Sequence, residues 1–155
     1  LIGSQYNYGA GDYQHVDYDP GNAMDDDRFA AMYNEAIKHL GKPYVLGTQG
    51  PDTFDCSGFI WWVLNHSGVM KVSRLTAQGY YNLCKPISTV DAKPGDLVFF
   101  EHTYNCPETI SHIGIYLGDG MMINAGGQYI NGHVVSSVCI VPVWHSYVSH
   151  YGRLP

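Results

Sequence analysis

The sequence predicts one α+β domain, in which helices come first and antiparallel strands follow. Apolar residues recur at helical spacing in the first half of the chain. Short runs of β-branched and aromatic residues, separated by turn residues, fill the second half. Helices and strands segregated in this way are typical of the α+β class. The chain has 155 residues, of which 45% are hydrophobic, which is enough for one compact core.

Residues 1–24 precede the first predicted helix and show no sustained apolar period. Because they are rich in Gly, Tyr, Asp and Asn, we interpret them as a linker or N-terminal extension. The folded domain is assigned to residues 25–155. Four tyrosines are candidates for holding the extension against the domain surface: Tyr6, Tyr8, Tyr13 and Tyr18.

The first helix is predicted over residues 25–40. Three aspartates open it, and negative charge is stabilised at a helix N-terminus. Gly41 suits a left-handed helix stop, and Pro43 cannot continue the helix. The apolar face has helical spacing and consists of Phe29, Met32, Tyr33, Ala36, Ile37 and Leu40.

Two further helices and about five strands complete the prediction. A loop rich in Gly and Pro leads to a second helix over residues 56–65, and a third, short helix covers 75–83. The N-terminal helices are expected to pack on an antiparallel sheet. Its strands are predicted at residues 97–100, 111–117, 121–125, 133–141 and 147–153, with a hairpin signal at Gly118-Asp119-Gly120.

The charge balance excludes several classes of partner. The chain has 8 Lys and Arg against 14 Asp and Glu, a formal charge of −6. A nucleic-acid-binding protein needs a basic surface, so we expect no nucleic-acid partner.

No run is long and apolar enough to span a bilayer, so no membrane span is expected in this fragment. Because the chain begins at Leu1, we interpret it as a fragment or processed form. We expect a monomer.

The four cysteines do not form a dense disulfide framework, and no Cys-x-x-Cys pair suggests zinc. Cys139 lies among apolar residues and is expected to be a buried structural thiol. Cys84 and Cys106 lie in or near loops, and their pairing stays open. His145 and His150 lack the spacing of metal ligands, so neither a metal nor an organic cofactor is expected.

Cys56 and His112 are the candidate chemical groups. Cys56 stands where the loop turns into the second helix, and a helix N-terminus stabilises a thiolate. His112 lies on a predicted strand, on the face shared with Gly114 and opposite the apolar face of Ile113 and Ile115. Taken singly, such a cysteine is more often a small buried hydrophobe, and such a histidine a hydrogen-bonded structural residue. Together they are the two parts of a cysteine peptidase.

Asn124 is the candidate third group. A hairpin loop with an odd number of residues centred on Asp119 would place Asn124 opposite Gly114, as a diagonal neighbour of His112 on the same face. A two-residue loop would turn Asn124 to the other face. In the first register its amide oxygen accepts the imidazole N–H, which aims the other ring nitrogen at the thiol.

Four blocks resemble, in order, the landmarks of the NlpC-type cell-wall peptidases, which are papain-like cysteine endopeptidases of bacteria. The blocks are Gly41-Lys42-Pro43-Tyr44-Val45-Leu46-Gly47, Phe54-Asp55-Cys56-Ser57-Gly58-Phe59, Lys93-Pro94-Gly95-Asp96-Leu97-Val98-Phe99-Phe100 and Ser111-His112-Ile113-Gly114-Ile115-Tyr116-Leu117-Gly118. The tail Tyr151-Gly152-Arg153-Leu154 is similar to the C-terminal peptidase domain of two-domain hydrolases from conjugative elements. That narrower resemblance implies an upstream lysozyme-like domain.

The resemblance implies a papain-like fold and a bacterial protein that works outside the cell or in the cell wall. It implies cleavage of peptidoglycan stem peptides between D-γ-glutamate and the third-position diamino acid. The catalytic roles fall on Cys56, His112 and Asn124, although many relatives have His at the third position. The resemblance also implies that Tyr44, Asp55 and Ser57 bind the start of the stem peptide. Asp55 is a candidate for binding a free L-Ala ammonium.

Two other functions remain as alternatives. The same groups serve an N-acetylmuramoyl-L-alanine amidase, which separates sugar from peptide, and the fold could also be a non-catalytic wall-binding module. The sequence leaves open whether the third residue is diaminopimelate or lysine, and whether a free stem-peptide N-terminus is required.

Overall fold

The computed structural model describes residues 14–130 and 133–155, which form three helices and one six-stranded sheet. The helices are α1 (Asp27–Ile37), α2 (Cys56–His66) and α3 (Ala77–Leu83), and short 3-10 turns lie at Gly21–Asp25 and Thr89–Asp91. The strands are β1 (Lys85–Ile87), β2 (Leu97–Glu101), β3 (Ile110–Gly118), β4 (Met121–Ile130), β5 (His133–Pro142) and β6 (Ser149–Arg153). They are antiparallel, in the order β1-β6-β2-β3-β4-β5.

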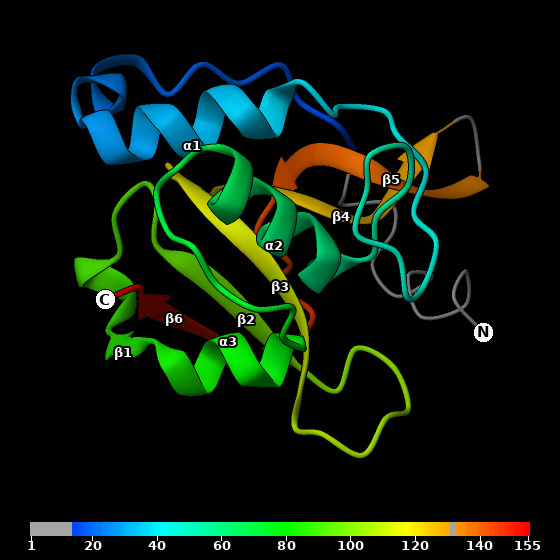
Figure 1. The fold of residues 1–155 in the computed structure, drawn as a ribbon. Coiled ribbons are helices and arrows are strands. Elements are labelled where there is room, and N and C mark those ends of the chain that lie inside the picture. The colour runs from blue at the N-terminus through cyan, green and yellow to red at the C-terminus, as the bar shows by residue number, and fades with distance from the viewer. Residues whose placement is uncertain (1–13, 131–132) are drawn as a thin grey trace.

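The helices cover the central strands (Figure 1). Helix α2 packs on β3 and β4, α3 packs on β3, and α1 lies against α2. The α+β prediction is confirmed. The sheet has one strand more than expected, because β1 was not predicted. This strand is only three residues long and contains Pro86, so it has neither the length nor the alternation that identifies a strand.

Helix α1 is shorter than predicted at both ends. Asp26 is its N-cap and accepts a hydrogen bond from the Phe29 N–H. Its apolar face points inward, as expected, through Phe29, Met32 and Ala36. The helix ends at Ile37, and turns carry the chain to Gly41, whose φ of 85° is the left-handed stop that the sequence predicts.

The β3–β4 hairpin sets the face on which Asn124 lies. Asp119 and Gly120 have φ of 53° and 73°, which is a two-residue type I′ turn rather than an odd loop. However, the pairing shifts between Tyr116 and Gly118, so one extra residue of β3 bulges out of the ladder. The bulge reverses the effect of the two-residue loop, and Asn124 lies beside Gly114 on the His112 face.

Two segments cover the outer edge of β5. Gly41 donates its N–H to the carbonyl of Val138, and Tyr44 donates to that of Ser136. Further along the edge, Val16 donates to the carbonyl of Ile140. Tyr18 donates to the carboxylate of Asp119 at 2.8 Å, so the described end of the extension does lie against the domain. Tyr6, Tyr8 and Tyr13 lie outside the described residues.

In residues 14–130 and 133–155, no helix combines the length and the hydropathy needed to cross a bilayer. The same residues contain no group of three or more His, Cys, Asp or Glu side chains that could hold a metal ion.

Gly120→Ala should lower the free energy of unfolding by about 1 kcal/mol, because a side chain resists the left-handed backbone of the turn. An added Cβ has nothing within 4 Å, so the effect is one of backbone strain alone. Chemical denaturation measures it. The control, Gly120→Asn, should lie close to wild type because Asn tolerates this conformation. Equal stability of Gly120→Ala and wild type would contradict the strain.

Candidate active site

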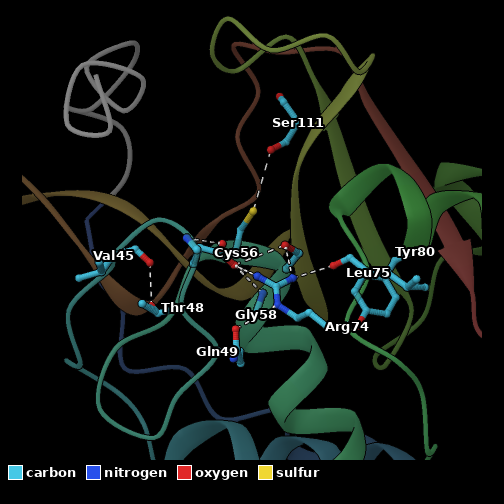
Figure 2. Close-up of polar contacts among 12 residues, drawn as sticks. Val45, Thr48, Gln49, Cys56, Gly58, Arg74, Leu75, Tyr80 and Ser111 are labelled. Carbon is cyan, nitrogen blue, oxygen red and sulfur yellow. Dashed lines mark hydrogen bonds and ion pairs between the residues drawn. The ribbon is translucent and has the colours of Figure 1, made fainter.

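Cys56 is the first residue of α2, and Asp55 is the N-cap. The Asp55 carboxylate accepts the N–H of Gly58 at 2.6 Å, which fixes the first turn. Figure 2 shows the Cys56 side chain pointing away from the helix toward β3, where its Sγ lies 3.9 Å from the carbonyl oxygen of Ser111. The backbone N–H groups of Ser57 and Ile113 also face the sulfur.

The thiol lies beside the part of β3 that does not pair with β4. The β3–β4 ladder ends at Ile115 and Ile123, so it does not include Ser111 and Ile113. The backbone groups of these two β3 residues instead meet Cys56. Since they flank His112 in the chain, the nucleophile candidate lies beside the strand position of the histidine.

His112 and Asn124 are directly hydrogen-bonded. Nε2 of His112 lies 2.8 Å from Oδ1 of Asn124, and both residues are buried. Because an amide oxygen only accepts, Nε2 donates, which leaves Nδ1 of the neutral ring as an acceptor. Asn124 is itself held by a bond from Nδ2 to the Cys139 carbonyl. The predicted pairing of His112 with Asn124 is therefore present in the structure.

Trp144 and Gly126 position this pair, and sequence reasoning did not single out either residue. The Trp144 indole stacks on the imidazole of His112, with ring centroids 4.3 Å apart. A Cβ at Gly126 would lie 2.3 Å from Asn124 Oδ1 and 3.1 Å from a ring carbon of His112. A glycine inside a strand often marks such a close approach, which was the one signal available.

Burial opposes charge on both candidate catalytic groups. It raises the pKa of the Cys56 thiol to about 12, and the negative charge of Asp55 adds to the effect. Burial also lowers the pKa of His112 to about 4, against the opposing effect of the bond to Asn124. At neutral pH the proton therefore stays on sulfur, and the imidazole is neutral.

A groove of about 430 Å³ opens above Cys56. Tyr44, Asp55 and Ser57, the predicted substrate-binding residues, all line it. The rest of the wall comes from the loop before α2, the start of α3 and the segment between β2 and β3. These residues are Leu46, Gly47, Gln49, Arg74, Leu75, Thr76, Ala77, Tyr104, Cys106, Glu108, Ile110 and Ser111.

Arg74, just before α3, is the main polar residue of the groove to which the sequence analysis assigned no role. Its guanidinium contacts Asp55 Oδ1 at 2.8 Å and Ser57 Oγ at 2.8 Å. It also donates to the carbonyl of Leu75 at 2.7 Å (Figure 2). The other carboxylate oxygen of Asp55 accepts the N–H of Gly47. Both oxygens of Asp55 are thus occupied by groups of the protein.

All four cysteines are free thiols. Cys139 is buried as predicted. Cys84 packs near Gly152 under the sheet, whereas Cys106 lines the groove.

A family model for the NlpC/P60 family matches residues 41–152. The chain belongs to the NlpC/P60 family. It is 45% identical over 126 residues to probable endopeptidase p60 of Listeria grayi, covering 81% of this chain and 23% of that protein. It is 36% identical over 129 residues to the bifunctional muramidase/DL-endopeptidase CwlT of Bacillus subtilis, covering 83% of this chain and 37% of that protein.

A solved structure gives the same family. NlpC1 from Trichomonas vaginalis matches with a TM-score of 0.65 and 32% identity, over 83% of this chain and 44% of that one. The predicted family and papain-like fold are confirmed, and the prediction of a cysteine-peptidase domain is confirmed at the level of the family. This NlpC/P60 domain spans only 23% and 37% of the two curated relatives named above.

Stability of the NlpC/P60 domain should depend on pH through His112. Its pKa is 6.5 when unperturbed and about 4 in the fold, so below pH 6.5 the unfolded chain binds the proton more readily. The stabilising contribution is complete above pH 6.5 and is lost as the pH falls to about 4. The loss is about 1.4 kcal/mol per pH unit, or about 3 kcal/mol in all.

Urea denaturation of wild type and His112→Gln between pH 4 and 7 isolates this contribution, since the variant lacks the imidazole. The difference in unfolding free energy between the two proteins should shrink toward pH 4. Parallel curves would mean that His112 titrates normally in the folded domain.

Proposed function

We propose that this NlpC/P60 domain is a peptidoglycan DL-endopeptidase. It hydrolyses the bond between D-γ-glutamate and the third-position diamino acid of stem peptides. Cys56 is the nucleophile, His112 the general base and acid, and Asn124 the group that orients His112. No metal or organic cofactor takes part in this proposal.

One observation carries the proposal. The Cys56 thiol lies at the floor of a groove and against the backbone on both sides of His112, whose far nitrogen is held by Asn124. A thiol, an imidazole and an amide in this order are the Cys-His-Asn arrangement of papain-like peptidases. The naming of CwlT as a DL-endopeptidase supports the choice of bond.

The protonation states favour proton transfer during attack rather than a resting ion pair. Nδ1 of His112 takes the thiol proton as the sulfur bonds to the γ-glutamyl carbonyl carbon. The carbonyl oxygen gains negative charge, which the N–H of Cys56 at the start of α2 stabilises. The imidazolium then protonates the leaving amine, and water attacks the thioester to release the acid and regenerate the thiol.

Tyr44, Ser57 and Arg74 are assigned to the start of the stem peptide, because they line the groove with Cys56 and Arg74 contacts Ser57 directly. Ser57 and Arg74 offer donors to a carboxylate of D-glutamate. Asp55 acts mainly by holding Arg74 and the first turn of α2.

The biological setting is also a proposal. CwlT is named a muramidase and DL-endopeptidase, and a muramidase acts on the cell wall, which supports a place outside the cell or in the cell wall of a bacterium. CwlT joins a muramidase to its endopeptidase, which supports an upstream lysozyme-like domain linked through residues 1–24. A monomeric domain covering residues 25–155 fits this arrangement.

Cys56→Ala should abolish cleavage of defined muropeptides, a loss of about 10⁴-fold or more, because no other group can form the acyl enzyme. Mass spectrometry of the digests checks both the nucleophile and the bond. An endopeptidase creates a new free amine on the diamino acid, whereas an amidase separates the sugar from L-Ala. Undiminished turnover would remove the nucleophile assignment, and binding without any product in wild type would favour a wall-binding module.

Gly126→Ala should lower kcat by about 10²-fold with little change in KM, because the new methyl group displaces Asn124 and the imidazole from their alignment. Steady-state kinetics on one muropeptide measure kcat and KM separately. The matched control is Gly120→Ala, a glycine substitution in the same hairpin but away from the pair. Wild-type kcat in Gly126→Ala would show that the alignment of His112 does not limit the reaction.

A further inference from the structure

We propose that the carboxylate of Glu108 binds a primary ammonium group of the stem peptide and thereby sets which peptides this domain cleaves. This inference rests on the proposed endopeptidase function. It assigns to Glu108 the cation-binding role that the sequence suggested for Asp55.

Glu108 belongs to the segment between β2 and β3, which loops out below the sheet in Figure 1. Its carboxylate lies 3.3 Å from Oγ1 of Thr76, the N-cap of α3. The loop is anchored again two residues further along both segments, where the N–H of Ile110 donates to Oε1 of Gln78 at 2.9 Å. Glu108 is thereby held at the wall of the groove, while its side chain is exposed to solvent and to any bound peptide.

Asp55 is poorly suited to bind a substrate cation. Its side chain is only 8% exposed, and its two oxygens accept bonds from the Gly47 and Gly58 N–H groups and from Arg74. An incoming ammonium would have to displace Arg74, which is already paired at 2.8 Å. That exchange replaces one charge-assisted hydrogen bond by another and gains little.

The net charge of the groove then comes from Glu108. Among the described residues that line it, the side chains charged at neutral pH are Asp55, Arg74 and Glu108. Asp55 and Arg74 neutralise each other, so one negative charge is left over a groove with a partly apolar wall. Such a charge attracts a cationic group and disfavours a neutral cap at the same place.

A stem peptide carries two primary ammonium groups that could meet Glu108. One is the α-ammonium of L-Ala, which exists only after the sugar has been removed. The other is the side-chain ammonium of the third residue. Glu108 contacts Thr76, which lies two residues from Arg74 in the chain, and Arg74 is assigned to the start of the peptide, which favours the L-Ala ammonium.

The test uses four synthetic peptides of the form L-Ala-γ-D-Glu-diamino acid, with the third residue that wild type cleaves. Either, both or neither amine is N-acetylated. Each peptide is assayed with wild type, with Glu108→Gln and with the control Asp27→Asn, an exposed carboxylate on α1. For wild type and control, acetylation of the L-Ala amine should lower kcat/KM by about five- to tenfold, the range expected of a partly exposed charged contact.

In Glu108→Gln, that preference should shrink to less than about twofold. A pH series separates the two amines, because an α-ammonium loses its proton near pH 8 and a side-chain ammonium near pH 10.4, to the approximation of model peptides. The ratio of wild-type to Glu108→Gln kcat/KM cancels the titration of the catalytic groups. This ratio should fall toward one as pH passes about 8 if L-Ala is the partner.

The inference is overturned if Glu108→Gln keeps the wild-type preference, or if wild type shows no preference between free and acetylated peptides. If acetylation of the third residue, and not of L-Ala, lowers kcat/KM in a way that depends on Glu108, then Glu108 still binds an ammonium group. Its partner is then the side-chain ammonium of the third residue. Failure of the endopeptidase proposal looks different, because wild type would then release no diamino acid product from any of the four peptides.

Discussion

The carboxylate of Asp55 joins three of the segments that line the groove. It caps α2 through Gly58, holds the preceding loop through Gly47, and pairs with Arg74 from the segment before α3. Gly58 makes this approach possible, since a Cβ there would lie 2.1 Å from the carbonyl oxygen of Thr48. The position of the Cys56 sulfur follows from this carboxylate, because the cap fixes the first turn from which the thiol projects.

The Cys56 thiol and the His112 imidazole are both buried, and this has a chemical consequence. Desolvation favours the neutral forms of both groups, so in the proposed mechanism the pair becomes charged during the attack on the substrate and not before it. Trp144 on one face of the imidazole and Asn124 at its far nitrogen leave the ring little freedom to turn. The contacts of Trp144 and Asn124 thus orient the imidazole before any substrate binds, as the proposed mechanism requires.

The sequence predicts the local structure at Cys56 and His112 better than the tertiary contacts around them. The positions of Cys56 and His112 follow from local patterns, a loop that enters a helix and a strand that alternates. The face of the sheet on which Asn124 lies depends on the register of the β3–β4 hairpin. The turn residues alone predict the wrong register, because the bulge in β3 that compensates for the two-residue turn has no clear signal in the sequence. Arg74 and Trp144 reach the site through tertiary packing, from segments distant in the chain, and local patterns contain no information about such contacts.

The two borders of the sheet are protected in different ways. β1 is three residues long and contains Pro86, while the backbone of β5 is occupied by the segments around Val16 and Gly41. Exposed strand borders are templates on which other chains can add and aggregate. Both borders of this sheet therefore offer few free backbone groups to a second copy of the domain, which limits self-association through strand addition.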